Sequence, residues 1–350
     1  MRTRRCRRQG LASVIRAVSI ASAAVVCSAA AHAQRPARLV LPGGERIEVL
    51  GLRRWTLDML QDSLVKYAPR ASLASHACAA TLRYTLGFAD AGSWLFVFGG
   101  DTASQNTVAV REPQDSARVR FRVLLSDTAR GRPEWRGART LLSAHPALMK
   151  FLTRAWPRGA NAAGTDLEQR TPDEQHAIDS LVSFLRVHGS ARWLAVARRT
   201  VFSSQNWQDR VLAIAILSRA PESDASWHAL LEAVRDADDR VNGIAAQSLD
   251  AMSQVRPRAV DWRPVAAGIH ALLEGTSLFQ FNKVADVLMR TSVGPRDARV
   301  FLRGGGDALL EFLSSEHPFL SGRSRTLLTQ LRGADLGPTP EPWREWIAAL

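Results

Sequence analysis

Apolar residues are spaced differently in the first and second parts of the chain, and the spacing predicts two kinds of structure. Before residue 130, short aliphatic runs are bounded by turn residues; residues 38–41 and 46–50, for example, flank Pro42-Gly43-Gly44. Such runs around a Pro/Gly turn are typical of a β-hairpin. After residue 171, apolar residues recur every three or four positions, which is typical of helices. We therefore expect a mixed fold, with a small α+β region followed by an all-α region.

Two helices are expected after the first hairpin. Thr56 can cap the first helix and Pro69 ends it. Its apolar stripe consists of Leu57, Leu60, Leu64 and Tyr67. A second helix is expected over residues 75–86, with Gly87 at its end.

Three further strands are expected over residues 94–98, 107–111 and 118–124. In the last two, apolar and polar residues alternate, and a turn at 112–116 joins them, which predicts a second hairpin. Together these elements predict a small sheet backed by two helices, forming an α+β domain over residues 35–130.

The following segment, residues 131–171, carries polar residues, Gly and Pro at both ends. It predicts a linker that contains one helix, at about residues 140–156. At its end, Thr171-Pro172-Asp173-Glu174 combines an N-cap Thr, Pro in the first turn and Glu at the third helical position, so a new helix should begin there. Its apolar stripe consists of Ile178, Leu181, Val182 and Leu185.

A repeated motif follows. Asp209-Arg210-Val211 leads into Ile214-Ala215, and thirty residues later Asp239-Arg240-Val241 leads into Ile244-Ala245. Val284-Ala285 occupies a matching place about forty residues further on, and a weaker copy lies at residues 324–331. Helices expected between the copies, over 227–234, 265–273 and 308–313, make each unit a pair of helices.

These residues resemble the HEAT-repeat family. The best copy is the run over residues 230–241, followed by Ala245-Ala246 and Leu249, although Asn242 stands where the family often has Arg. The resemblance covers about 45% of the chain, with one strong copy, one fair copy and two degenerate ones. It implies a HEAT-like solenoid of helical hairpins over residues 172–335, with buried alanines between helices and a concave surface suited to binding a protein.

The carboxyl end of this stack and the turn of its best copy carry further signals. Residues 336–350 should form a capping helix, because Trp343, Trp346 and Ile347 share one face. The acids at the best turn, Asp236, Asp238 and Asp239, suit the positive end of the next helix, so we assign them to capping and not to catalysis or metal. The glycine and distal Glu of a calcium loop are missing.

The first 33 residues indicate export. Residues 1–10 are basic, 11–30 are apolar and small, and Ala31-His32-Ala33 precedes Gln34. This order is typical of a secretory signal peptide cleaved between Ala33 and Gln34, which predicts a periplasmic or secreted protein. Its six arginines leave with it, so 46 − 6 = 40 basic residues face 33 acids, and the formal charge falls from +13 to +7. No later apolar run is long enough to span a membrane.

Candidate chemistry is sparse. Cys78 is the one cysteine after residue 33, so it forms no internal disulfide, and we expect it to be a buried apolar residue; a free thiol is the alternative. His76 and Cys78 lie two positions apart on an expected helix and face different ways, which disfavours a metal pair. The chain lacks the common hydrolase, zinc-protease and nucleotide-binding motifs, so we assign no catalytic, cofactor or metal residue.

These features favour an exported, non-enzymatic scaffold that binds a protein partner in the cell envelope through its helical stack. The alternative is an envelope enzyme or enzyme accessory with its site in the α+β domain. A nucleic-acid binder is a third hypothesis, and it would need a continuous arginine stripe along the stack. The arginines are instead interleaved with acids, which disfavours it.

Overall fold

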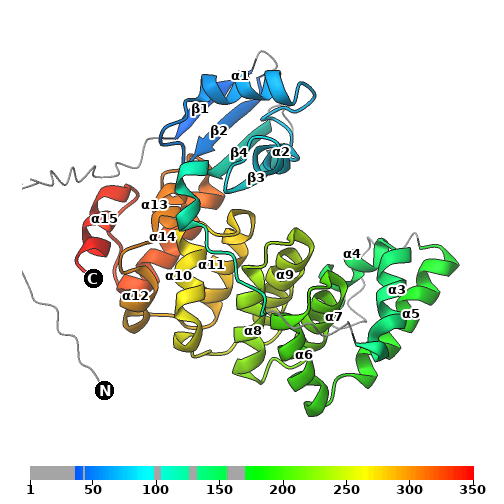
Figure 1. The fold of residues 1–350 in the computed structure, drawn as a ribbon. Helices are drawn as coiled ribbons and strands as arrows, with labels where there is room; N and C mark the ends of the chain where they lie inside the picture. Colours follow the sequence, from blue (N-terminus) through cyan, green and yellow to red (C-terminus); the bar gives the residue numbers. More distant parts are fainter. Residues whose placement is uncertain (1–35, 42–43, 98–103, 126–131, 155, 157–169) are drawn as a thin grey trace, which may run out of the picture. The chain divides into compact units, whose positions relative to one another are not determined.

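The computed structural model describes residues 36–41, 44–97, 104–125, 132–154, 156 and 170–350. The described residues belong to one compact unit. The predicted signal peptide and its cleavage site lie outside the described residues, as do the polar stretches 126–131 and 157–169. The described chain is mostly helical, with a four-stranded sheet near its amino terminus (Figure 1). None of the described helices is both long and apolar enough to cross a bilayer.

The sheet has the strand order β1-β2-β4-β3. β1 (Ala37–Val40) and β2 (Arg46–Leu50) are antiparallel, so the first predicted hairpin is confirmed. β4 (Ser104–Arg111) runs parallel to β2 and antiparallel to β3 (Asp90–Val97). The two central strands, β2 and β4, are buried along most of their length, as expected for strands covered on both faces.

One face of the sheet is covered by α1 (Leu57–Tyr67) and α2 (Cys78–Tyr84). The hydroxyl of Thr56 accepts a hydrogen bond from the N–H of Met59, which confirms the predicted cap. Tyr67 is 58% exposed, so the predicted stripe is buried only in its middle. α2 is shorter than predicted. The core under the two helices includes Ile47, Val49, Leu60, Leu64, Leu82, Val108 and Val110.

The opposite face of the sheet packs against the helical part, defined here as α3 to α15. Leu50 and Ala109 belong to the same apolar core as those helices, and Trp94 and Phe96 pack against it. The ring of Trp94 meets Phe312 edge to face, with centroids 5.3 Å apart. The sheet is therefore a layer between two sets of helices.

The predicted strand over residues 118–124 is wrong. Pro113–Arg118 forms a short 3-10 helix, η1, and the residues after it lie outside the sheet, with Val123 87% exposed. The alternation does correspond to an extended chain, but β4 already has β2 on one edge and β3 on the other, so no edge is left for a hairpin. Residues 118–125, here called the strap, run along the helical part instead (Figure 1).

The strap bonds to the carboxyl ends of three successive helical pairs. The N–H of Arg120 donates to the hydroxyl of Thr276, that of Arg122 to the carbonyl of Arg235, and that of Leu125 to the carbonyl of Phe202. Carbonyls in the last turn of a helix lack partners within the helix, so the strap satisfies groups that would otherwise need water. The contacts are two and three residues apart, which corresponds to about 7 and 10 Å of extended chain, close to the usual spacing of packed helices.

The predicted linker contains two helices and not one. α3 (Arg136–Ala144) and α4 (Ala147–Arg154) are separated at His145-Pro146, because Pro146 lacks the N–H that a continuous helix needs. Trp135, Leu148 and Phe151 from this segment are buried in the core of the helical part. The described part of this segment, residues 132–154 and 156, is therefore packed against the core.

Residues 170–350, all of them described, contain helices and turns and no strand. The capping box at Thr171 and Glu174 opens the first of these helices, as predicted. The structure adds α12, which was not predicted. The helices are α5 (Pro172–Val187), α6 (Ala191–Ser203), α7 (Trp207–Leu217), α8 (Asp224–Val234), α9 (Asp239–Val255), α10 (Ala266–Glu274), α11 (Phe281–Arg290), α12 (Pro295–Leu302), α13 (Asp307–Leu313), α14 (Pro318–Arg332) and α15 (Pro340–Ala348).

Contacts between these helices follow a regular order. α6 contacts α7, α8 contacts α9, and α13 contacts α14, while α7, α9, α11 and α14 contact one another in sequence. Ala215, Ala245 and Ala285 are buried in these seams, so their predicted burial is confirmed. At the carboxyl end, α15 contacts α13, buries Trp343 and Ile347 and packs the partly buried Trp346 against the same core.

Candidate binding pocket

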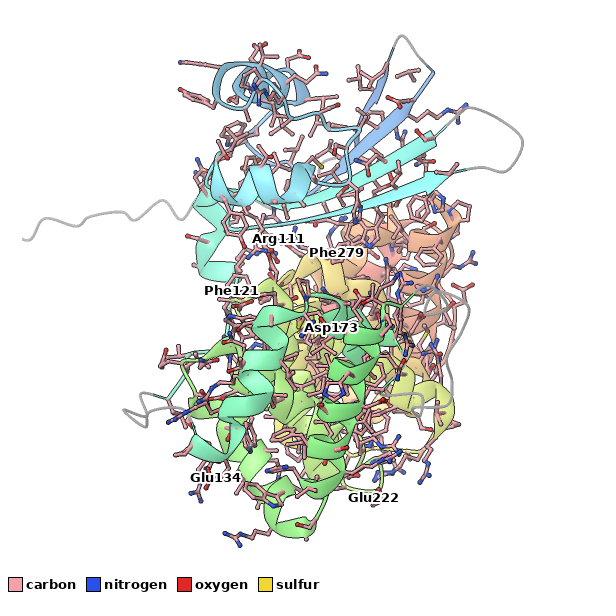
Figure 2. All side chains as sticks on the ribbon, turned by 90° about the vertical axis from the view of Figure 1, so that its right-hand side faces the viewer. Arg111, Phe121, Glu134, Asp173, Glu222 and Phe279 are labelled. Atoms are coloured by element: carbon pink, nitrogen blue, oxygen red, sulfur yellow. The ribbon has the colours of Figure 1, made fainter. Side chains whose placement is uncertain are left out.

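A pocket of about 310 Å³ lies where the sheet meets the helical part. α2 and β3 supply one side, and the start of α9 and residues 277–280 supply the other. Small side chains leave space for this pocket: alanines line its α2 side, and Gly243 lines its α9 side. In Figure 2, the labelled Phe279 marks this junction below the sheet. The volume lies at the lower end of the range for small-molecule sites.

Asp90 ties the two sides of the pocket together. One carboxylate oxygen accepts the N–H of Ala91 and the other accepts the N–H of Leu278, each at 2.9 Å. Leu278 begins the short 3-10 helix η6 (Leu278–Gln280), so the bond joins β3 to the helical part. Burial raises the pKa of Asp90 to about 6, and the nearby Arg83 and these two N–H groups oppose the rise.

Arg83 of α2 links this carboxylate to α9. Its Nε lies 3.5 Å from Asp90 Oδ1, and its Nη1 donates to Asp239 Oδ1 at 2.6 Å. The hydroxyl of Tyr84 donates to the other oxygen of Asp239, at 2.9 Å. Arg83 also lies over the ring of Phe121 in the strap, 5.8 Å from its centre. The basic group in the pocket is therefore held by two acids and two aromatic rings, those of Tyr84 and Phe121.

Two buried amides form the polar end of the pocket. Gln280 Nε2 donates to Asn242 Oδ1 at 3.2 Å, and Asn242 Nδ2 donates to the carbonyl of Asp236 and to Asp239 Oδ1. Gln280 is 4% exposed, and its Oε1 has no hydrogen-bond partner among the described residues. Turning the Gln280 amide over would set two oxygens against each other, so the assigned orientation is the favourable one. The Oε1 atom is itself inaccessible, so the two amides act as a support for the pocket wall.

Phe279 forms the aromatic side of the pocket. It is 38% exposed, and its ring stacks on Trp94 with centroids 6.0 Å apart. The His76 ring meets it edge to face at 5.6 Å. A Cβ at Gly92 would lie 2.8 Å from the N of Phe279, so the close approach of β3 to η6 requires glycine there. The ring is thus held in a fixed place with part of its surface open.

The structure separates the two residues that the sequence suggested as a chemical pair. His76 lines this pocket, whereas Cys78 lines a neighbouring one with Ala68 and Thr81. Cys78 is 1% exposed, which confirms its predicted burial; burial raises the pKa of its thiol, and hydrogen bonds from neighbouring groups oppose the rise. The described residues contain no group of three His, Cys, Asp or Glu side chains placed to hold a metal ion.

The predicted capping role is confirmed for Asp238, whereas Asp236 and Asp239 chiefly form ion pairs with arginines of other elements. Asp238 caps α9 by accepting the N–H of Arg240 at 3.0 Å. Asp236 is buried and pairs with Arg122 of the strap and Arg210 of α7. Two buried guanidinium groups therefore share one buried carboxylate.

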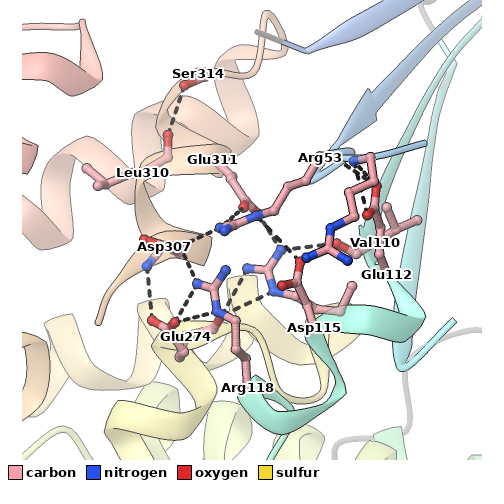
Figure 3. A network of polar contacts seen from close by, with 12 residues as sticks. Arg53, Val110, Glu112, Asp115, Arg118, Glu274, Asp307, Leu310, Glu311 and Ser314 are labelled. Atoms are coloured by element: carbon pink, nitrogen blue, oxygen red, sulfur yellow. Dashed lines mark hydrogen bonds and ion pairs between the residues drawn. The ribbon is translucent and has the colours of Figure 1, made fainter. Parts of the chain in front are cut away.

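A second concentration of charge lies near the pocket and joins the sheet to α10 and α13 (Figure 3). Arg111, at the end of β4, pairs with Glu311 and also donates to the carbonyl of Glu274. Glu112 accepts the backbone N–H groups of residues 53–55. The charged cluster comprises Arg53, Arg111, Glu112, Asp115, Arg118, Glu274, Asp307 and Glu311. Because its cations and anions bind one another, we interpret it as a structural joint.

Sequence reasoning identified none of the pocket residues as functional. Asn242 was noted only as a departure from the HEAT pattern, and here it supports Gln280. The sequence did carry one local signal for the strap: Arg118, Arg120 and Arg122 alternate there, and acids lie at the turns of the later helices. The pocket itself depends on contacts between residues more than 150 positions apart, such as Asp90 and Leu278.

Comparison with known proteins yields no relative. No protein-family model matches the chain, and no curated protein and no solved structure matches it.

Proposed function

We propose that the protein is an exported, non-enzymatic scaffold whose helices form a HEAT-like solenoid and bind another protein in the cell envelope. The solenoid is supported by the order of contacts, in which each helical pair contacts the next and buried alanines line the seams. A pair of helices cannot bury its apolar face alone, so stacking of neighbours is the expected way to stabilise such units.

The observation that carries the proposal is a series of ion pairs across successive helices. Asp250 of α9 pairs with Arg290 of α11 at 2.7 Å, and Asp286 of α11 pairs with Arg323 of α14 at 3.0 Å. Arg290 and Asp286 also approach each other, at 3.6 Å. We call these four residues the charge ladder. They are partly exposed, whereas the strap bonds to a different set of helices, at the carboxyl ends of α6, α8 and α10.

A partly exposed charge ladder suits a protein partner. Charged groups at the rim of an interface chiefly set specificity and association rate, and they can exchange internal pairs for pairs with the partner. The face also keeps its shape when free, because the ladder ties three helices together. We therefore place the partner on the face of α9, α11 and α14.

The test uses the chain from Gln34 as bait in an envelope extract, beside the double variant Arg290→Glu with Arg323→Glu. Arg325→Glu is the matched control, because Arg325 pairs with Asp335 away from the ladder. We expect the same partner with the wild type and the control, and its loss with the double variant. Failure to recover any reproducible partner, or equal recovery with all three, would overturn the proposal.

Export has its own test. Amino-terminal sequencing of the protein recovered from the periplasm or medium should begin at Gln34. Recovery of only an uncleaved chain from the cytoplasm would contradict export while leaving the binding test intact.

A second candidate is an envelope enzyme or accessory with its site in residues 35–130. The pocket favours it, because Asp90 there is a carboxyl with a raised pKa beside Arg83. The geometry supports it less well, since both oxygens of Asp90 already accept backbone N–H groups. Turnover of a substrate by the wild type that Asp90→Asn abolishes, with folding retained, would favour this candidate.

A further inference from the structure

We propose that the pocket beside Phe279 binds a neutral, hydroxyl-rich ring, such as one sugar unit of a glycan. The inference is independent of the protein partner proposed above, because the pocket and the charge ladder share no residue. Its steps are the charge of the pocket, its hydrogen-bonding groups, its aromatic side and its size.

The charged groups of the pocket already satisfy one another. Arg83 binds both Asp90 and Asp239. Lys283 of α11 lies over the ring of Phe279, 5.7 Å from its centre, and is attracted by two acids of the charge ladder. A charged ligand would have to displace one of these internal pairs, and it would gain little after that cost. The pocket therefore favours a neutral ligand.

Donors and acceptors nevertheless stand side by side. Asp239, whose side chain is 50% exposed, offers acceptor sites on the α9 side of the pocket. Arg83 and His76 carry N–H groups on the opposite side. A hydroxyl group both donates and accepts, so neighbouring hydroxyls on one ring can meet both kinds of group.

The aromatic side fits the other face of a sugar. Phe279 is fixed by Trp94, His76 and Lys283, and the 38% of the residue that stays exposed is the surface open to a ligand. The C–H bonds on one face of a pyranose are slightly positive and pack on the negative face of an aromatic ring. Alanines and Gly243 leave room for a ring between Phe279 and α2, and the volume of about 310 Å³ suits a single unit.

The test compares three sugars of nearly equal shape by saturation-transfer NMR with the chain from Gln34. Glucose is neutral, glucuronate is an anion and glucosamine is a cation at neutral pH. We expect millimolar binding of glucose and weaker binding of both charged sugars. Absence of glucose binding at about 50 mM, or tighter binding of either charged sugar, would overturn the proposal.

Variants locate the binding. Gly243→Leu should abolish the glucose signal, because the new side chain fills the pocket. The backbone tolerates the change, because a Cβ at Gly243 meets only Gln280 Nε2, at 3.8 Å. Phe279→Ala should also abolish it. Phe319→Ala is the matched control, since Phe319 is 41% exposed and lies outside the pocket. The double variant in the charge ladder should retain the signal. A glucose signal that survives Gly243→Leu and Phe279→Ala, with thermal unfolding unchanged, would overturn the assignment.

Discussion

The guanidinium group of Arg111 lies 2.5 Å from the carboxylate of Glu311, across 200 residues of sequence. Both side chains are buried, and Arg111 also donates to the carbonyl of Glu274. A Cβ at Gly275 would lie 2.2 Å from Arg111 Nε, and φ of Gly275 is +122°, so glycine is needed for the guanidinium to reach this place. The pair fixes the end of β4 to α13.

Removal of one partner of this pair should be costly. Arg111→Met leaves Glu311 buried with a weaker partner, Arg53 at 3.7 Å, and we expect a loss of about 3–5 kcal/mol in the free energy of unfolding. Urea unfolding followed by circular dichroism measures it. Arg325→Met is the control, because Arg325 and Asp335 are both about 40% exposed and their pair should contribute about 0–1 kcal/mol. Equal losses in the two variants would contradict a structural joint at Arg111.

Asp236→Asn should lower the free energy of unfolding more than Arg122→Met does, because of how the strap is paired. Arg122 and Arg210 share the buried carboxylate of Asp236, and burial lowers the pKa of Arg122 despite this acid. Asp236→Asn leaves two buried cations without an anion and should cost about 3–5 kcal/mol. Arg122→Met leaves one cation with one anion, so it should cost clearly less. Unfolding in urea at pH 7 decides it, and a larger loss for Arg122→Met would show that the strap contact outweighs the charge balance.

Local signals were enough to predict much of the helical part. The capping box at Thr171 and the recurrence of apolar residues after Asp209 and Asp239 act within one or two helical turns, so they can be recognised in the sequence. The strap was wrongly predicted as a strand because its alternation fixes an extended chain and says nothing about its partner. Its partner was set by the filled edges of β4.

The pocket could not have been predicted for the same reason. Each of its groups is ordinary in sequence: an Asp at the start of a strand, an Arg on a short helix, a Phe in a turn. They come together because the sheet packs on the helices through Trp94, Leu50 and Ala109, a contact between segments far apart in the chain. The spacing of apolar residues indicates which face of a helix or strand is buried, but it does not indicate which other element packs against that face.

The raised pKa of Asp90 predicts a change of stability with pH. The folded protein keeps a proton on Asp90 up to about pH 6, whereas the unfolded chain releases it near its ordinary value of 3.8. The contribution of this group therefore falls as the pH rises from about 4 to 6, by about 3 kcal/mol at most. The free energy of unfolding of the wild type minus that of Asp90→Asn should fall over this range, because other groups cancel in the difference. A difference that is constant or rises between pH 4 and 6.5 would contradict the assignment.

Two glycines inside helices should respond oppositely to alanine. At Gly243 of α9, a Cβ would meet only Gln280 Nε2 at 3.8 Å, an ordinary contact, so Gly243→Ala should stabilise the protein by about 0.5–1 kcal/mol through the lower entropy of the unfolded chain.

At Gly268 of α10, a Cβ would lie 2.2 Å from Glu232 Oε1, so that side chain must move. Glu232 pairs with Arg235, whose guanidinium donates to the carbonyl of Arg120 in the strap. Gly268→Ala should therefore lose the helix gain and loosen the strap, giving no stabilisation or a net loss. Thermal unfolding of both variants, with hydrogen exchange at the N–H of Arg122, measures the two effects; faster exchange in Gly243→Ala than in Gly268→Ala would reverse the predicted coupling between α10 and the strap.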